Sequence, residues 1–346
     1  MIKLTLYIVL LLGGLYLLIR GSDIFVDGSV HVAKFFKMSE LLIGMTLVCF
    51  GTSMPELFVS VNGSLKGTSD LVIGNMIGSC LFNICIILGI VSIVHPVRLL
   101  KDTARKDIYM SLVTAVVFLL LMLDTLGTNL ISNIISRTDG AILLVLFILF
   151  MYYNLYHSVN FAAMRRKRKI QKRKGMTPDE KDKKVEQKQK IELIKNIILC
   201  LLGGLLVYAG SECVLNGAVG LAIKLGVSET FIAILVIAVG TSLPEIATSI
   251  SAIKKRRINI AVGNLIGSNM YNMLFITGAS AVINPLHVVT NALWVDAIVF
   301  IAVIAILIIF TKVRYVNKGS YELSRLEGII LIVVYIAYAA YVIMRG

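Results

Sequence analysis

The stretch Gly51-Thr52-Ser53-Met54-Pro55-Glu56 recurs as Gly240-Thr241-Ser242-Leu243-Pro244-Glu245, and both copies lie inside apolar segments. A second motif follows each copy at the same distance: Gly74-Asn75-Met76-Ile77-Gly78-Ser79 with Asn83, and then Gly263-Asn264-Leu265-Ile266-Gly267-Ser268 with Asn272. Matching residues of the two halves are 189 positions apart throughout, as Glu245 is from Glu56. The sequence therefore contains an internal repeat that places a carboxylate, hydroxyls and carboxamides at matching positions.

The composition is that of a membrane protein. Of the 346 residues 58% are apolar, and the mean hydropathy is +0.88. About twenty consecutive apolar residues span a bilayer as a helix. On this basis the sequence predicts an all-α polytopic membrane protein with ten transmembrane helices, at about 4–29, 40–64, 70–94, 107–126, 138–158, 193–218, 229–253, 259–283, 290–311 and 326–344.

The repeat predicts how the two halves are arranged. We expect a first transmembrane repeat at 1–159, a basic linker at 160–192 and a second transmembrane repeat at 193–346. Each half holds five segments, an odd number, so the two halves must insert with opposite orientations. Inverted repeats with helices interrupted near the middle of the membrane are typical of secondary transporters.

The net charge of +14 is distributed as the positive-inside rule requires. With the linker in the cytoplasm, the loops on its side carry most of the Lys and Arg residues, and those on the other side carry little beyond Lys66, Arg137 and Lys224. This predicts a multi-pass protein of the inner or plasma membrane with both termini outside. Because topology explains the charge, nucleic-acid binding is not expected.

The linker itself allows two interpretations. A block of like charges is usually solvated, and we favour a solvated connector between the repeats. The alternative is contact with anionic lipid through its basic run. Within the linker, Thr177 could begin a helix with Pro178 at the first helical position.

The Gly-Thr-Ser-x-Pro-Glu stretches predict interrupted helices with buried charge. Proline lacks an N–H and clashes with the preceding turn, so we expect a break near Gly51 and Gly240 with carbonyls facing inward. A carboxylate at the centre of a bilayer costs at least about 2.5–3.5 kcal/mol and is functional by default. The structural alternative is a glutamate that is protonated or paired with a base, and Arg20 is the only obvious base at that depth. Because the repeat partner of Arg20 is Ala209, which is not a base, pairing with Arg20 could not explain both glutamates.

Polar residues in the following segment form a stripe. Asn75, Ser79 and Asn83 are spaced by four residues, which places them on one helix face, and the second half repeats the pattern. The Gly74/Gly78 spacing and its repeat allow close approach to a neighbouring helix. The stripe can supply cation ligands or polar contacts between helices; for Asn75 and Asn264 both interpretations stay open. All the donors are oxygens, which suit Ca²⁺ and Na⁺.

Other chemistries have little support in the sequence. The five cysteines form no CxxC pair, and the four histidines do not cluster, so neither a disulfide framework nor a zinc site is implied. No Ser/His or Cys/His pairing suggests a nucleophile. We therefore expect an ion transporter without a cofactor rather than an enzyme.

The paired motifs resemble the alpha repeats of the cation/calcium exchanger superfamily, and most closely its prokaryotic sodium/calcium exchangers. The resemblance covers about 4–158 and 193–344. It implies ten helices in two inverted halves, alternating access, and the first and sixth segments as the moving pair. The linker does not resemble the large calcium-sensing domains of animal relatives.

The resemblance also implies roles for individual residues. Glu56 and Glu245 would be the central calcium ligands, with Asn83 and Asn272 lining the middle of the site. Many prokaryotic relatives carry an aspartate at the position of Asn272, which this chain lacks. The remaining ligands would be the carbonyls and hydroxyls of Thr52 and Thr241, the hydroxyls of Ser53, Ser79, Ser242 and Ser268 at flanking sodium sites, and the backbone oxygens of Cys49 and Ala238.

These observations predict a secondary-active antiporter of Na⁺ and Ca²⁺. We expect three Na⁺ per Ca²⁺, hence electrogenic exchange, and no potassium requirement. A proton/calcium antiporter on the same fold is the main alternative, although the Thr-Ser pairs favour sodium. A channel is a second alternative, because conduction needs no alternation.

Overall fold

The computed structural model describes residues 2–36, 38–122, 133–172, 180–224, 238–288, 291–313, 315–317 and 320–345. Within these ranges all ten predicted segments are helical. Parts of three of them, 123–126, 229–237 and 290, lie outside the described residues. The first half contains α1 (Ile2–Phe36), α2 (Glu40–Ile43), η1 (Gly44–Val48), α3 (Cys49–Thr52), α4 (Met54–Leu65), α5 (Ser69–Phe82), η2 (Asn83–Ile87), α6 (Leu88–Val94), α7 (Lys101–Met122) and α8 (Arg137–Lys172).

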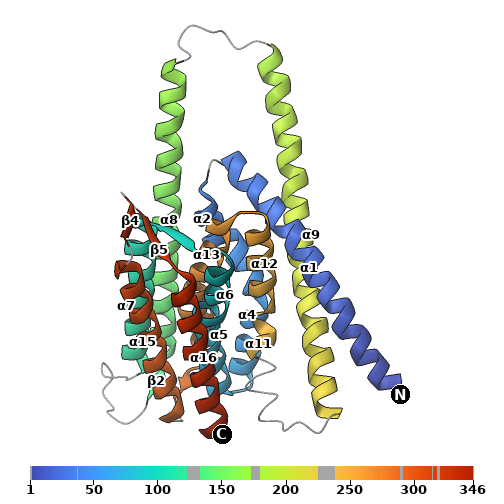
Figure 1. The fold of residues 1–346 in the computed structure, drawn as a ribbon, viewed down its shortest axis with the longest axis vertical. Coiled ribbons are helices and arrows are strands. Elements are labelled where there is room, and N and C mark those ends of the chain that lie inside the picture. The colour runs from blue at the N-terminus through green and yellow to red at the C-terminus, as the bar shows by residue number, and fades with distance from the viewer. Residues whose placement is uncertain are drawn as a thin grey trace.

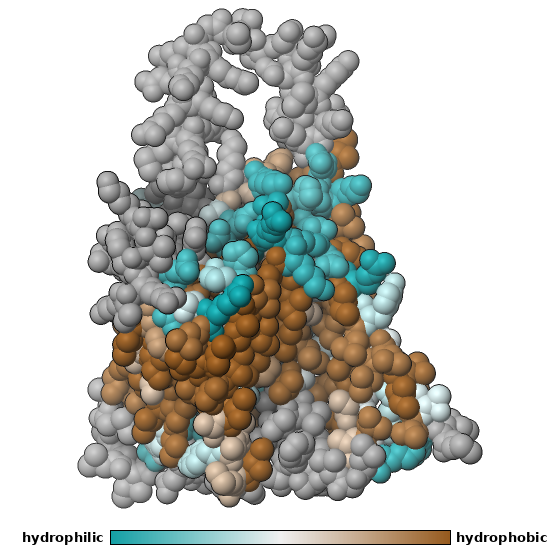
Figure 2. Space-filling view, in the orientation of Figure 1, coloured by the Kyte–Doolittle hydropathy of each residue, from teal (hydrophilic) through white to brown (hydrophobic). Residues whose placement is uncertain are grey.

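The second half has the same order of elements. It contains α9 (Glu180–Lys224), α11 (Ala238–Thr241), α12 (Leu243–Lys254), α13 (Ile258–Met270), η4 (Tyr271–Ile276), α14 (Thr277–Ile283), α15 (Asn291–Val313) and α16 (Arg325–Arg345). Among the described helices, six are long and apolar enough to cross a membrane, and the pair Glu40–Thr52 and Met54–Leu65, bent by 50°, would make a seventh span. On the face seen in Figure 2, apolar side chains form a broad band over the described helices.

The helices that carry the polar stripes lie at the centre. In the span Ser69–Val94, 72% of the apolar window is buried, compared with 17% in Lys3–Phe36. Both chain termini lie at one end of the molecule, while α8 and α9 project past the other end (Figure 1). The predicted linker therefore begins and ends in helix: residues 160–172 continue α8 and residues 180–192 belong to α9, whereas Thr177 and Pro178 lie outside the described residues.

Five short strands occur among the described residues, and the sequence analysis did not predict them. β1 (Val97–Leu100) pairs with β5 (Ser320–Leu323), which pairs with β4 (Tyr315–Asn317), and β2 (Ile134–Ile135) pairs with β3 (Leu286–His287). Each sheet joins two loops. Because the ten segments cross the membrane in alternating directions, the two loops of each sheet lie on the same side. The pairing depends on contacts between distant loops, which local periodicity does not reveal.

The repeat extends to backbone geometry at the turns. The turn after α4 has Gly67 at φ 73°, and its repeat mate after α12, Arg256, has φ 56°. The same three hydrogen bonds close both turns; in the first they run from residues 66, 67 and 68 to the carbonyls of 62, 64 and 63. Because Arg256 takes this left-handed conformation without being glycine, the fold of the repeat outweighs a local steric cost.

A seam of glycines joins α1 to α9. A Cβ atom built on Gly14 would lie 2.8 Å from both Gly210 O and Val214 N. The other glycines of the seam also meet the facing helix closely, and they are spaced by seven residues: Gly21 and Gly28 on α1, and Gly203, Gly210 and Gly217 on α9. The two helices lie side by side at the edge of the molecule (Figure 1), so one helix from each half forms a packed pair.

Two adjacent glycines of α1 should respond oppositely to a methyl group. Gly14→Ala is expected to lower the free energy of unfolding by about 1–3 kcal/mol, because the seam is already closely packed. In the described part of the chain no heavy atom lies within 4 Å of a Cβ built on Gly13, so Gly13→Ala should stabilise the helix by about 0.5–1 kcal/mol. Thermal unfolding of both variants in detergent measures this. Equal melting temperatures of the two variants would mean that α1 and α9 can move apart to accept a methyl group at position 14 without loss of stability.

Candidate functional site

Both Gly-Thr-Ser-x-Pro-Glu stretches form a broken helix. Ser53 (φ −83°, ψ 13°) and Ser242 (φ −88°, ψ 6°) interrupt the helices with nearly the same dihedral angles. Each break lies two residues after the predicted glycine, because Pro55 and Pro244 sit in the first turn of α4 and α12, where a missing N–H costs nothing. Since Pro244 cannot donate to the Gly240 carbonyl, that oxygen accepts from Ser211 Oγ of α9 at 3.1 Å.

The two glutamates occupy the first turns that follow these breaks. Glu56 is 2% exposed and Glu245 is 1% exposed. The positive end of a helix dipole favours negative charge at such positions. Among the described residues no Lys, Arg or His forms an ion pair with either glutamate, and Arg20 instead lies over the Tyr16 ring, 5.9 Å from its centroid. Pairing with a base therefore does not account for either carboxylate.

Each carboxylate is bonded to hydroxyls of the opposite half. Ser242 Oγ donates to Glu56 Oε1 at 3.4 Å, and Ser53 Oγ donates to Glu245 Oε1 at 3.2 Å. Ser268 Oγ also donates to Glu245 Oε1, at 3.4 Å, and lies 3.2 Å from Ser53 Oγ. The halves thus meet in one shared site.

Two further bonds cross between the halves. Thr52 Oγ1 donates to Asn264 Oδ1 at 3.1 Å, and Thr241 Oγ1 donates to Asn75 Oδ1 at 3.4 Å. The Asn264 amide nitrogen in turn donates to Thr248 at 3.3 Å. For Asn75 and Asn264 the contacts therefore match the interpretation of polar contacts between helices, and both side chains orient a predicted threonine ligand.

Several buried oxygens in this region have no hydrogen-bond partner. A buried unsatisfied polar group costs about 1–3 kcal/mol, so a set of such groups requires an explanation. Carboxylate, hydroxyl and carboxamide oxygens are ligands for hard cations. The unpartnered atoms among the predicted ligands are Glu56 Oε2, Glu245 Oε2, Ser79 Oγ, Asn83 Oδ1 and Asn272 Oδ1.

Local helix widening accompanies the carboxamides. The π-helical segment η2 begins at Asn83, and η4 contains Asn272. π-Helical turns are rare and frequently occur at functional sites. The side chains of both residues are about 1% exposed, so they can contact only groups inside the bundle.

Two predicted ligands, Cys49 and Ala238, would act through their backbone oxygens. Cys49 begins α3, and its carbonyl accepts from Ser53 N at 2.9 Å and from Thr52 Oγ1 at 3.3 Å. Ala238 begins α11. These two bonds engage both lone pairs of the Cys49 carbonyl, so a cation bound there would replace the longer bond, the one from the Thr52 hydroxyl.

The predicted close approach through glycines is confirmed in the second half. A Cβ built on Gly263 would lie 2.2 Å from Leu41 O, and one on Gly267 would lie 2.7 Å from the Met45 Cα. Among the described residues, no heavy atom lies within 4 Å of a Cβ built on Gly74 or Gly78. The repeat-related neighbours of these two glycines fall largely at 230–237, which lie outside the described residues.

Sequence reasoning missed three polar side chains that support the site. Ser60 accepts from Asn75 Nδ2 at 3.3 Å, Thr248 plays the matching part for Asn264, and Asn269 accepts from Asn83 Nδ2 at 3.0 Å. The repeat could not reveal Thr248 and Asn269, because their mates are Val59 and Cys80; Ser60 does repeat, as Ser249, and this repeat was the signal that could have found it.

Two half-chains whose broken helices surround buried carboxylates define a polytopic membrane transporter. The family model for the sodium/calcium exchanger protein matches residues 6–156 and 195–344, so the chain belongs to this family. The putative antiporter CaxA of Alkalimonas amylolytica is 29% identical over 95% of this chain and 96% of its own. The sodium/calcium exchanger MaX1 of Methanosarcina acetivorans is 30% identical over 96% and 97%, respectively.

A solved structure is similar over nearly the whole chain. The sodium-calcium exchanger NCX_Mj, soaked with 10 mM Na⁺ and zero Ca²⁺, is 28% identical with a TM-score of 0.79, and the match covers 97% of this chain and 99% of that one. The predicted fold of ten transmembrane helices in two inverted five-helix repeats is confirmed by this match. The family consists of ion exchangers rather than enzymes.

Neutralising either glutamate should remove cation binding without unfolding the protein. Glu56→Gln and Glu245→Gln each delete the charge that the unpartnered oxygens surround, so calcium binding should fall below detection. The melting temperature should hold or rise, since a neutral side chain costs less to bury at this depth. Calorimetric titration with CaCl₂ and thermal unfolding measure both, with Asp70→Asn, an exposed carboxylate of α5, as the control. Normal calcium affinity in either variant would make that glutamate structural.

Proposed function

We propose that the protein is a secondary-active antiporter that exchanges Na⁺ for Ca²⁺ across a cell membrane. The observation that carries the proposal is the pair of buried glutamates, which have no basic partner among the residues that the structure describes and lie among unpartnered carboxamide and hydroxyl oxygens. The relative named a sodium/calcium exchanger supports this cargo, and the relative named a putative antiporter supports antiport. No cofactor enters the proposal, because the ions are the substrates.

The cargo would bind at the predicted residues. Ca²⁺ would contact Glu56 and Glu245 in the middle of the site, beside Asn83 and Asn272. The flanking positions would take Na⁺ through the hydroxyls of Thr52, Thr241, Ser53, Ser79, Ser242 and Ser268 and the backbone oxygens of Cys49 and Ala238. Hydrogen bonds already place serine hydroxyls against both carboxylates, which supports sharing of one site by the two ions.

Alternation would involve α1 and α9 moving as a pair against the remaining helices. The glycine seam supports this, because it packs the two helices closely along their length. At one end α1 is held to α12, where Lys255 Nζ lies 2.8 Å from Asp27 Oδ1 and donates to Asp23 O at 2.6 Å. The repeat mates Lys66 and Glu212 form no ion pair in the described part of the chain. The two ends of the repeat thus differ in contacts, and also in residue type, because the repeat mate of Asp27 is the uncharged Asn216.

The charge of the site sets the expected electrical behaviour. Two carboxylates and two carboxamides are neutralised by one Ca²⁺, whereas three Na⁺ leave one positive charge. Moving one charge across the membrane is worth about 2.3 kcal/mol per 100 mV. A negative interior would therefore favour Na⁺ entry and Ca²⁺ exit. The carboxamide of Asn272, in place of an acid, supports exchange without potassium.

Two other functions remain as outcomes of the test. A proton/calcium antiporter would use protonation of the glutamates in place of sodium; the hydroxyls around each carboxylate favour sodium. A channel would need no alternation, and the burial of both glutamates disfavours an open path.

We further propose the orientation and domain division that the charges imply. The first repeat would cover 1–159 and the second 193–346, with the basic linker 160–192 in the cytoplasm and both termini outside. The positive-inside rule supports this assignment. The linker would be a solvated connector, and contact of its basic run with anionic lipid of the inner leaflet is the alternative.

Sodium-driven calcium flux should depend on voltage. In proteoliposomes with sodium, potassium and pH gradients set independently, ⁴⁵Ca²⁺ uptake should require a sodium gradient, ignore potassium, and change when an ionophore pair shifts the membrane potential. Flux that is indifferent to voltage would point to two Na⁺ or two H⁺ per Ca²⁺. Uptake driven by pH alone would favour the proton antiporter.

The orientation can be tested by labelling. In a cysteine-free background, Lys172→Cys should react with an impermeant thiol reagent only after the cells are opened, since residue 172 lies in the basic linker. Lys66→Cys, in a turn of the opposite side, should react from outside intact cells and serves as the matched control. Labelling of position 172 in intact cells would reverse the proposed topology.

A further inference from the structure

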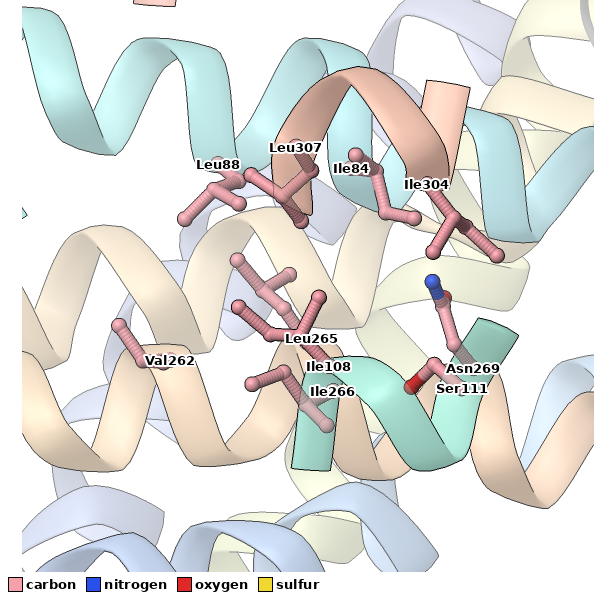
Figure 3. A pocket seen from close by; sticks show the side chains of 10 residues that line it. All are labelled: Ile84, Leu88, Ile108, Ser111, Val262, Leu265, Ile266, Asn269, Ile304 and Leu307. Atoms are coloured by element: carbon pink, nitrogen blue, oxygen red, sulfur yellow. The ribbon is translucent and has the colours of Figure 1, made fainter. Parts of the chain in front are cut away.

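Asn269 lies next to the candidate site but was not among its predicted ligands. It belongs to α13 and is 2% exposed. Its side chain lines a cavity of about 30 Å³ whose other walls are aliphatic except for Ser111 (Figure 3). A carboxamide in such an apolar wall must find its hydrogen bonds in the protein, because leaving them unmade is costly.

Asn269 connects a backbone carbonyl to a predicted ligand. Its Nδ2 donates to Cys80 O at 3.4 Å, and its Oδ1 accepts from Asn83 Nδ2 at 3.0 Å. The direction of these bonds is fixed, since a backbone carbonyl can only accept. The Cys80 carbonyl therefore requires the nitrogen of Asn269, and the oxygen of Asn269 in turn requires the nitrogen of Asn83.

This sequence of hydrogen bonds determines the orientation of the Asn83 carboxamide, the last group in the network. With its nitrogen held, Asn83 must present Oδ1 to the site, and that atom is buried without a partner. Were the Asn83 carboxamide reversed, an N–H group would face the cation and repel it. We propose that Asn269 is a positioning residue, which fixes the carboxamide of Asn83 so that its oxygen faces the transported cation. This proposal rests on the proposed function, in that it requires a cation at the site.

The two halves differ at this point. The repeat mate of Asn269 is Cys80, whose thiol lies beside the Asn272 carboxamide. A thiol is a weak donor and a weak acceptor, so it orients a carboxamide less firmly than another carboxamide does. Asn83 is thus the better fixed of the two amide ligands, and the cation site is asymmetric although its ligands repeat.

A purely structural role of Asn269 predicts different effects of its substitution on calcium affinity. If Asn269 served only to join α13 to α5 through Cys80, its loss would lower stability, and any effect on cation affinity would be independent of Asn83. If it acts through Asn83, its loss matters only while Asn83 is present. A double-mutant cycle separates these possibilities.

The experiment is calorimetric titration of the purified full-length protein with CaCl₂. Asn269→Leu keeps the volume, and Asn269→Ala provides a second variant should the leucine disturb folding. Each should weaken calcium binding about 10- to 100-fold, as is usual when a partner that orients a ligand is lost. In an Asn83→Ala background the same substitutions should change affinity by no more than about twofold, the usual error of additivity.

Ser111→Ala is the matched control. Ser111 lines the same cavity and is buried, but it bonds to Asp107 O and Met270 Sδ rather than to Asn83, so its loss should leave calcium affinity unchanged. Normal affinity in folded Asn269 variants, or an equal loss in the Asn83→Ala background, would overturn the proposal. If the unmodified protein bound no calcium, the proposed function and this inference would both be refuted. If it bound calcium but the Asn269 variants did not behave as expected, only the inference would be refuted.

Discussion

The structure depends on two carboxylates that are buried without a base. A charge at membrane depth is tolerated only when the surrounding groups replace water. Here the replacement is supplied across the centre of the molecule: Ser242 of the second half bonds Glu56, and Ser53 of the first half bonds Glu245. Ser268 also bonds Glu245 from within the second half, but each glutamate takes at least one hydroxyl from the opposite half, so the electrostatic requirement of the site also holds the two repeats together.

The breaks in the helices follow from the same requirement. An unbroken helix would keep its carbonyls within its own ladder and its termini at the membrane surface. A break at Ser53 brings the start of a new helix, with its positive dipole end, to the depth of Glu56. The proline cannot donate a hydrogen bond to the carbonyl four residues earlier, but it fits the first turn of a helix, so the same residue interrupts one helix and helps to start the next. A six-residue stretch can therefore produce both the break and the buried glutamate beside it.

Sequence alone predicted the elements that repeat or follow a local rule. The glutamates, the breaks and the ten segments could be derived from spacing, proline chemistry and hydropathy. The bonds from Thr52 to Asn264 and from Asn83 to Asn269 could not, because they join residues about 190 to 210 positions apart across the interface between the halves. The seven-residue glycine spacing of α1 and α9 was visible in the sequence, but its partner helix was not. The short sheets were missed for the same reason.

The exchange of hydroxyls between halves has a consequence for synthesis. The hydroxyl that serves Glu56 belongs to Ser242, 186 residues later in the chain. At about 5–20 residues per second, the first glutamate is made about ten to forty seconds before its partner exists. During that interval the nascent first half must hold the carboxylate near water or in its protonated form, and only the arrival of α12 completes its surroundings. The inverted repeat is thus assembled late, around an acid that was in place from the beginning.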